Sequence, residues 1–251
     1  MARVKAASPF AKKDNNNNNE DDQSEQTAVA TATEDTALAT PTPSHTLDVN
    51  ESDLRLPTMK IVAKVGPLSE QFRPGEIVVD GDLVISDGKE PVEFTVLAAR
   101  KKYIEYTVYG SDQMPRTLYS IEDVKAEGGT AEWSDGPDGR VRPSWDPALE
   151  MTILLKSPLK EPSSHFPFEF AGSDYAVLTY ELTRTAFRRA GHKIITAHQY
   201  HFKKDWLSGA FDLTTHTADI GGNKVIVPEV RYGVRHSDDF ISWARELTPA
   251  Q

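Results

Sequence analysis

Two segments of the chain combine Lys and Arg side chains with aromatic rings. The first is Arg100-Lys101-Lys102, which is followed by Tyr103 and Tyr106. Cations spaced along a strand can contact successive phosphates, and rings beside them can stack on bases. A charged bend whose tyrosines pack into the core would contain the same residues. The segment therefore raises nucleic-acid binding as a hypothesis without deciding it.

The second segment runs from Arg184 to Lys204 and contains six Lys or Arg residues but no Asp or Glu, although the chain has 38 acidic against 28 basic residues and a net charge of −10. Thr183 is expected to cap a helix over 184–197 whose cations share the solvent face. A solvated basic face balanced by acidic loops is the alternative. The candidate nucleic-acid contacts of both segments are Arg100, Lys101, Lys102, Tyr103, Tyr106, Arg188, Arg189, Lys193, Tyr200, Lys203, Lys204 and Trp206.

Catalytic and metal-binding signatures are missing from the sequence. There is no cysteine, no phosphate-binding GxxxxGK[ST] loop, no GxGxxG and no GxSxG. His198 and His201 lie near Asp205, but no HExxH sequence accompanies them. Asp80 and Asp82 flank a glycine, where aspartate is common for backbone reasons alone. We therefore expect a protein that is not an enzyme and that needs no metal or cofactor. A nuclease that uses such scattered acids is a weaker hypothesis.

The elements that must position these residues are mostly short strands. Apolar residues at even positions from Val92 to Ala98 alternate with other residues, and the same parity resumes at Ile104, which predicts a half-buried strand. Strands over 76–79 and 83–86 are expected to form a hairpin around Gly81. Further strands are expected at 59–65, 151–156, 210–217 and 224–232, a strand or helix at 175–182, a loop at 128–147, and a helix at 238–247 capped by Ser237.

These elements predict an α+β, β-rich fold with one or two helices late in the chain. A curved barrel of the OB type with elaborations is the expected architecture, and a mixed β-sandwich is the alternative. Residues 58–251 are expected to form a single β-rich globular domain.

Residues 1–57 are expected to be a disordered, acidic and polar tail. They include Asn15–Asn19 and Glu20–Asp22, and their apolar residues are too few to offset the entropy of ordering. Such a tail could compete weakly for a basic groove, recruit partners or simply aid solubility. No apolar run approaches the ~18 residues of a membrane span, and no secretory signal is recognisable. The sequence thus predicts a cytoplasmic protein without a membrane partner.

One order of features extends over roughly residues 59–247. Arg73-Pro-Gly-Glu-Ile-Val78 precedes a short hairpin and the basic, aromatic strand 92–109. A Pro-rich region, the segment 182–190, an aromatic strand, a second hairpin and a short helix with acidic residues at its start follow. This order resembles phage-encoded single-stranded-DNA-binding proteins of replication and recombination modules. The resemblance implies an OB-like fold and DNA binding without catalysis. Such proteins often end in an acidic tail, whereas here the acidic segment is N-terminal.

The leading hypothesis is therefore a single-stranded-DNA-binding protein of phage replication or recombination, with replication or recombination proteins as further partners through residues 1–57. The alternative is a structural or adaptor protein, such as a phage particle component, that uses the acidic tail for partner contact. Strand order, self-association, the choice between DNA and RNA, and the source are left open.

Overall fold

The computed structural model describes residues 55–108, 113–137 and 139–248. Most of the predicted disordered segment, residues 1–54, lies outside the described residues. The described residues belong to one compact unit, which spans Val49–Gln251.

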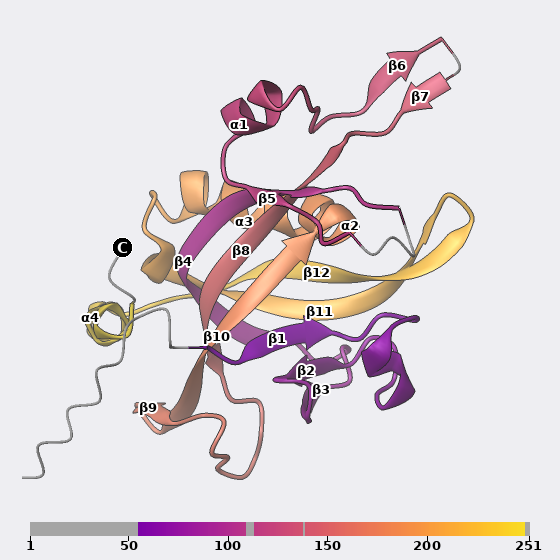
Figure 1. Ribbon diagram of the computed structural model, residues 1–251. Coiled ribbons are helices and arrows are strands. Elements are labelled where there is room, and N and C mark those ends of the chain that lie inside the picture. The colour runs from indigo at the N-terminus through magenta and orange to yellow at the C-terminus, as the bar shows by residue number, and fades with distance from the viewer. Residues whose placement is uncertain (1–54, 109–112, 138, 249–251) are drawn as a thin grey trace, which may run out of the picture. The chain divides into compact units, whose positions relative to one another are not determined.

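A strongly curled sheet of mixed direction forms a half-barrel at the centre of this unit (Figure 1). Its strands follow the order β12-β11-β4-β8-β10-β1-β2-β3, with β5 paired to β4 and β9 paired to β10. β1 and β10 run parallel, and the other neighbours run antiparallel. The strands are β1 (Thr58–Ile61), β2 (Ile77–Val79), β3 (Leu83–Ser86), β4 (Val92–Glu105), β5 (Thr117–Leu118), β8 (Trp145–Lys156), β9 (Phe168–Phe170), β10 (Ser173–Thr183), β11 (Gly209–Ile220) and β12 (Asn223–Arg235).

The remaining elements are one separate hairpin and several short helices, most of them late in the chain. They are the 3-10 turns η2 (Pro67–Glu70) and η5 (Trp206–Ser208), the helices α1 (Ile121–Ala126), α2 (Arg184–Ala186), α3 (His192–Thr196) and α4 (Asp238–Glu246), the π-helical segments η3 (Phe187–Gly191) and η4 (Ala197–His201), and the hairpin strands β6 (Ser134–Gly136) and β7 (Gly139–Val141). The predicted β-rich fold with a curved sheet and late helices is confirmed.

Strand β4 contains an irregularity that inverts the predicted pattern of buried residues. Val92, Phe94 and Val96 pack into the main core as expected, but the pairing with β8 shifts register between Val96 and Ala98. One extra residue in a strand sends every later side chain to the opposite face. Tyr103 is therefore buried, whereas the sequence pattern assigned Ile104 to the core.

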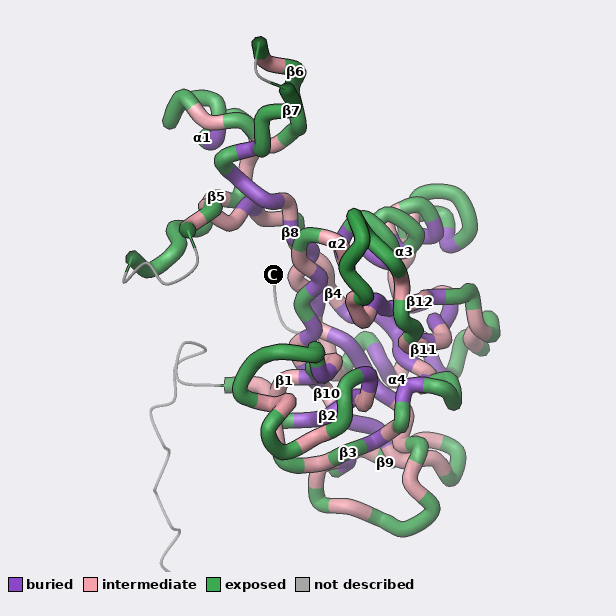
Figure 2. The backbone as a smooth tube through the Cα atoms, turned by 90° about the vertical axis from the view of Figure 1, so that its right-hand side faces the viewer, coloured by how far each residue is buried: buried purple, intermediate pink, exposed green. Residues whose placement is uncertain are grey.

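Both faces of the sheet are covered, each by a different helical segment. The main core lies between the sheet and the segment α2-η3-α3-η4, which contributes Phe187, Ala190, Ile194 and Ala197. On the opposite face, α4 buries Phe240 among residues of β4, β8 and β10. Figure 2 shows buried residues concentrated along the central strands. Helical segments thus pack on both faces of the sheet.

Both helices predicted late in the chain are present. The first begins after Thr183 and continues to His201, beyond the predicted end at residue 197. Its two π-helical segments widen it locally, a feature that is frequent near functional sites. α4 begins at Ser237, whose hydroxyl oxygen accepts a hydrogen bond from the Phe240 amide at 3.3 Å.

An arm built from α1, β5, β6 and β7 projects beyond the half-barrel (Figures 1 and 2). Its small core contains Tyr103, Val124 and Trp145. Arg116, just before β5, links the end of β4 to the end of α1 because its guanidinium contacts Glu105 and Glu127 at 2.9 and 2.8 Å. The prediction of a loop over 128–147 was wrong, since this segment forms the β6–β7 hairpin and begins β8. The turn between β6 and β7 joins two strands that pair with each other and not with the large sheet.

Candidate nucleic-acid interface

The two basic, aromatic segments meet in one groove between the sheet, the long helical segment and the arm. The groove has a volume of about 530 Å³. Strand β4 supplies Lys101 and Tyr103, while Arg188 and His192 come from the helical segment. The hairpin region completes the groove with Glu132, Trp133 and Arg140.

The position of each groove residue follows from its element. Lys101 pairs in register with Leu149 of the main core, so its side chain lies on the face of the sheet that carries the helical segment. Arg188 and His192 are four residues apart and occupy adjacent positions on one side of the helix. Phe187 is buried beneath them and lies 6.0 Å from the Lys101 ammonium. A buried aromatic ring therefore lies beneath the cationic side chains at this side of the groove.

The charge balance of the groove is positive. Lys101, Arg140 and Arg188 form no ion pair with any residue in the described ranges. Glu132 is the acidic residue among those that line it. Three cations against one carboxylate leave an excess charge for binding an anion.

An aromatic ring is accessible at the rim of the groove. Trp133 is 39% exposed, and the Arg140 guanidinium lies 5.6 Å from the centre of its ring. A partly exposed indole beside an arginine can stack on a nucleobase while the arginine contacts the adjoining phosphate.

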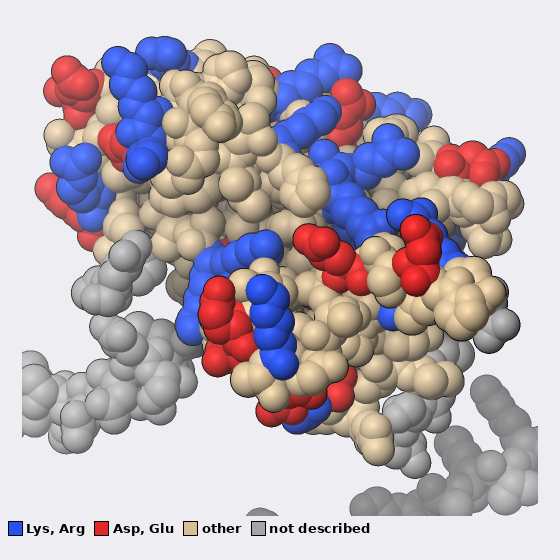
Figure 3. Space-filling model, turned by 90° about the horizontal axis from the view of Figure 1, so that it is seen from above, with Lys and Arg blue, Asp and Glu red and all other residues tan. Residues whose placement is uncertain are grey.

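More cations follow the outer side of the helical segment. Arg189 and Lys193 are exposed and lie four residues apart, and Tyr200 further along is 81% exposed. Lys203 and Lys204 are exposed where the segment ends. No ion pair involving these four cations occurs in the part of the chain that the structure describes. Figure 3 shows Lys and Arg gathered on the face seen from above, with some Asp and Glu between them.

Three of the predicted contact residues have other partners. Lys102 is only 12% exposed and its ammonium lies 3.4 Å from Glu150 and 3.3 Å from Glu181. Tyr103 is 5% exposed, so its ring is packed in the core of the arm. Trp206 is half-buried and stacks on His198 with 3.8 Å between ring centres. Lys102 is thus neutralised, the Tyr103 ring is too deeply buried to stack on a base, and His198 covers one face of the Trp206 ring.

Arg100 and Tyr106 lie outside the groove. Arg100 is next to Lys101 in a strand and therefore points to the opposite face, where its guanidinium lies 3.4 Å from the centre of the Tyr119 ring. Tyr106 lies under Arg142, at 3.5 Å from the ring centre. The structure thus divides the predicted site between the groove with its helical segment and these two separate arginine–tyrosine pairs.

The acidic and histidine residues considered for catalysis are not assembled. Among the described ranges, no group of three or more His, Asp and Glu residues could hold a metal ion. Asp82 faces His165 at 3.5 Å, and Asp80 occupies a turn with a φ of 51°. In the same ranges, no helix has the length and apolar character required to cross a membrane.

Trp133 and Arg140 were missed as candidate groove residues. They flank the turn-rich stretch Asp135-Gly-Pro-Asp-Gly139, which is itself a hairpin signal with a ring on one side and a cation on the other. A short hairpin over that stretch places the two residues beside each other.

No protein-family model, curated protein or solved structure matches the chain.

Proposed function

We propose that the protein binds single-stranded nucleic acid, with DNA as the principal ligand. The observation that carries this proposal is the meeting of Lys101, Arg188, Arg140 and Trp133, from three distant segments, in one groove. The cations contact phosphates and Trp133 stacks on a base. A base within a duplex is already stacked on its neighbours, so a ring at the rim favours a single strand.

The helical segment extends this contact path. Arg189, Lys193, Lys203 and Lys204 continue the line of cations that form no ion pair with a described residue, and Tyr200 offers a second exposed ring. A strand that leaves the groove along this side meets further cations. Each phosphate that they neutralise releases condensed counterions, so binding weakens with salt.

We also propose a barrel of the OB type and a role in phage DNA replication or recombination. A barrel of the OB type is supported by the curled sheet, and a role in phage DNA replication or recombination by the order of sequence features. That role would place the protein in the cytoplasm of the host cell.

A fluorescence-anisotropy titration of the full chain with labelled oligo-dT at several salt concentrations tests the proposal. We expect affinity to fall as salt rises. The variant Arg188→Ala/Arg189→Ala/Lys193→Ala should reduce the slope of log K against log salt by ~0.7 for each phosphate that the protein no longer neutralises.

The matched control is Lys64→Ala/Lys160→Ala/Lys224→Ala, which removes three exposed lysines from other elements and changes the net charge by the same amount. If both triple variants lose affinity equally, charge alone drives binding and the site is elsewhere. Absence of binding at low salt would overturn the proposal.

A further inference from the structure

A second, chemically different cavity lies at the point where strands β1 and β10 separate. Its volume is about 660 Å³, within the ~300–1,000 Å³ range of small-molecule sites. The register between the two strands ends at Met59 and Tyr180, but β10 continues to Thr183. The edge of β10 beyond Tyr180 therefore borders an open space instead of a neighbouring strand.

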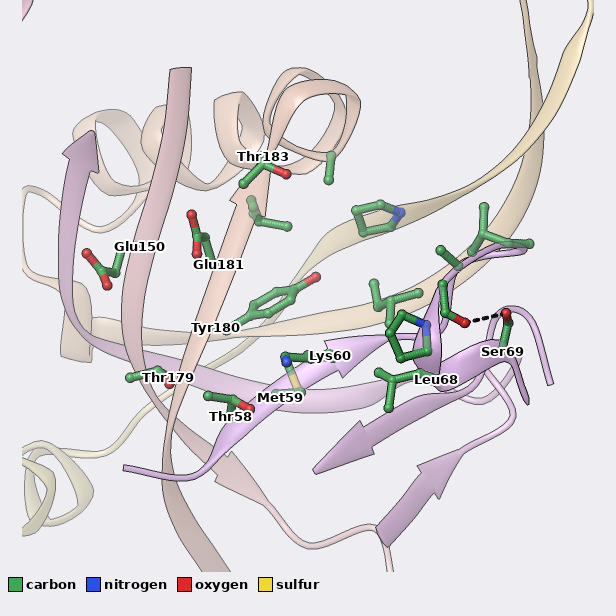
Figure 4. A pocket seen from close by; sticks show the side chains of 18 of the residues that line it. Thr58, Met59, Lys60, Leu68, Ser69, Glu150, Thr179, Tyr180, Glu181 and Thr183 are labelled. Atoms are coloured by element: carbon green, nitrogen blue, oxygen red, sulfur yellow. Dashed lines mark hydrogen bonds between the residues drawn. The ribbon is translucent and has the colours of Figure 1, made fainter. Parts of the chain in front are cut away.

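The walls of this cavity are largely apolar. Strand β12 crosses on the far side from β10, and η2 closes another side (Figure 4). The principal apolar lining residues are Met59, Ile61, Leu182, Ile226 and Pro228.

A buried polar atom of this cavity lacks a hydrogen-bond partner among the described residues. Tyr180 is 2% exposed, and its hydroxyl forms no hydrogen bond within the described part of the chain. Figure 4 shows that the hydroxyl points into the cavity, away from Glu150 and Glu181. A buried hydroxyl without a partner is costly, and nearly all such groups in native proteins are satisfied by protein, water or ligand.

The charged residues that line the cavity point away from Met59 and Tyr180, because neighbouring residues of a strand face opposite sides of the sheet. Lys60 and Glu181 are exposed, and Glu150 and Glu181 are both held by Lys102. An ionised group next to Tyr180 would have no opposite charge in contact, so the interior favours an uncharged oxygen or nitrogen. Burial raises the pKa of the Tyr180 hydroxyl, which keeps it protonated at neutral pH and able to donate or accept a hydrogen bond.

We propose that this cavity binds one uncharged, mainly apolar small molecule whose hydrogen-bonding oxygen or nitrogen contacts the Tyr180 hydroxyl. The proposal is independent of nucleic-acid binding because none of the residues that line the cavity lines the groove. An exchangeable ligand of this kind would satisfy the hydroxyl and occupy the gap between β1, β10 and β12.

The test uses the full chain and the uncharged fluorescent amine N-phenyl-1-naphthylamine, with 1-decanol and decanoate as competitors. We expect saturable fluorescence enhancement with one site per chain. Decanol should displace the probe at a concentration roughly tenfold lower than decanoate, because a carboxylate beside the Tyr180 hydroxyl must be desolvated with no counter-charge in contact. Tyr180→Phe keeps the shape but removes the hydroxyl, and should weaken decanol competition about three- to tenfold, as expected for one neutral hydrogen bond.

Two variants fill the cavity. Ile61→Trp should abolish probe binding, and Ile226→Phe provides the same test if the first variant fails to fold by circular dichroism. Val234→Trp, on an exposed position of β12 that does not line the cavity, should bind normally. The proposal is overturned if the folded wild-type protein shows no saturable binding, which would mean that water alone fills the cavity. It is overturned equally if a folded filled variant binds as well as wild type, if decanoate competes as well as decanol, or if Tyr180→Phe changes nothing.

Discussion

Two adjacent lysines on strand β4 have opposite roles because a strand sends neighbouring side chains to opposite faces. Lys101 lines the groove without an ion pair to any described residue, whereas Lys102 lies between Glu150 and Glu181. We expect Lys101→Ala to weaken oligo-dT binding about two- to fivefold and leave stability unchanged. Lys102→Ala should instead lower the free energy of unfolding by about 1–2 kcal/mol, because two carboxylates lose the cation between them.

Anisotropy titration and urea unfolding of both variants measure these effects together. Equal losses of affinity in the two variants would contradict the assignment of Lys101 to the site.

Two exposed aromatic rings each lie beside an arginine. Trp133 lies in the groove beside Arg140, and Tyr119 lies under Arg100 on the other face of β4. Trp133→Ala should reduce oligo-dT affinity by about 1–3 kcal/mol, the range for loss of one stacked base, and Trp133→Phe should restore part of it. Tyr119→Ala is the control and should have little effect. A larger loss with Tyr119→Ala would move the interface to the opposite face.

At the scale of elements, the docking of α4 on the sheet depends on a neutral histidine. His236 lies just before the helix, stacks on Phe240 at 3.9 Å and shares a hydrogen bond of 2.7 Å with the Thr95 hydroxyl. Burial, and secondarily the charge of Lys156, lowers the pKa of His236 from its ordinary 6.5 to about 4. Between these two values the unfolded chain binds a proton that the folded chain excludes.

The free energy of unfolding should therefore be highest above pH 6.5 and decrease as the pH falls from 6.5 to 4. Since His236 keeps contact with solvent, we expect a loss of about 1–2 kcal/mol, less than the full shift of its pKa implies. Urea unfolding at pH 7, 6, 5 and 4 measures this loss. His236→Gln should remove this part of the pH dependence, and His216→Gln, at an exposed position, should retain it. The same slope in both variants would contradict the role of His236.

Local sequence signals predict individual elements better than they predict which residues share a surface. The turn at Asp80 and Gly81 and the cap at Ser237 act within a few residues, and both elements form where expected. The irregularity between Val96 and Ala98 arises from pairing with β8, more than fifty positions away in the printed sequence, and no local pattern reveals it. It is this irregularity that directs Lys101 to the groove, Lys102 to two carboxylates and Tyr103 to the core.

The candidate site was also predicted only in part, because some of its residues follow from local sequence and others from contacts between distant segments. The cations of the helical segment could be identified because no acidic residue interrupts them from Arg184 to Lys204. The contribution of Trp133 and Arg140 depends on the position of the arm beside the helical segment, which is a long-range property. A net charge of −10 also conceals the groove, because the acidic residues are distributed over the rest of the chain.

Residues 1–54 contain ten acidic and four basic residues and so carry much of the negative charge of the chain. Their deletion changes the net charge from −10 to −4 and removes an acidic segment that could compete with phosphates for the basic groove. We expect the truncated protein to bind oligo-dT roughly two- to tenfold more tightly at low salt, because long-range repulsion of the phosphates decreases. At about 0.3 M salt the two proteins should converge, since charges more than ~10 Å apart are then largely screened. Anisotropy titrations of both proteins over this salt range provide the measurement, and replacement of the ten acids by Asn or Gln in the full chain separates charge from length. An affinity gain that persists unchanged at high salt would show that the segment obstructs the groove sterically, and a loss of affinity would show that it contributes to binding.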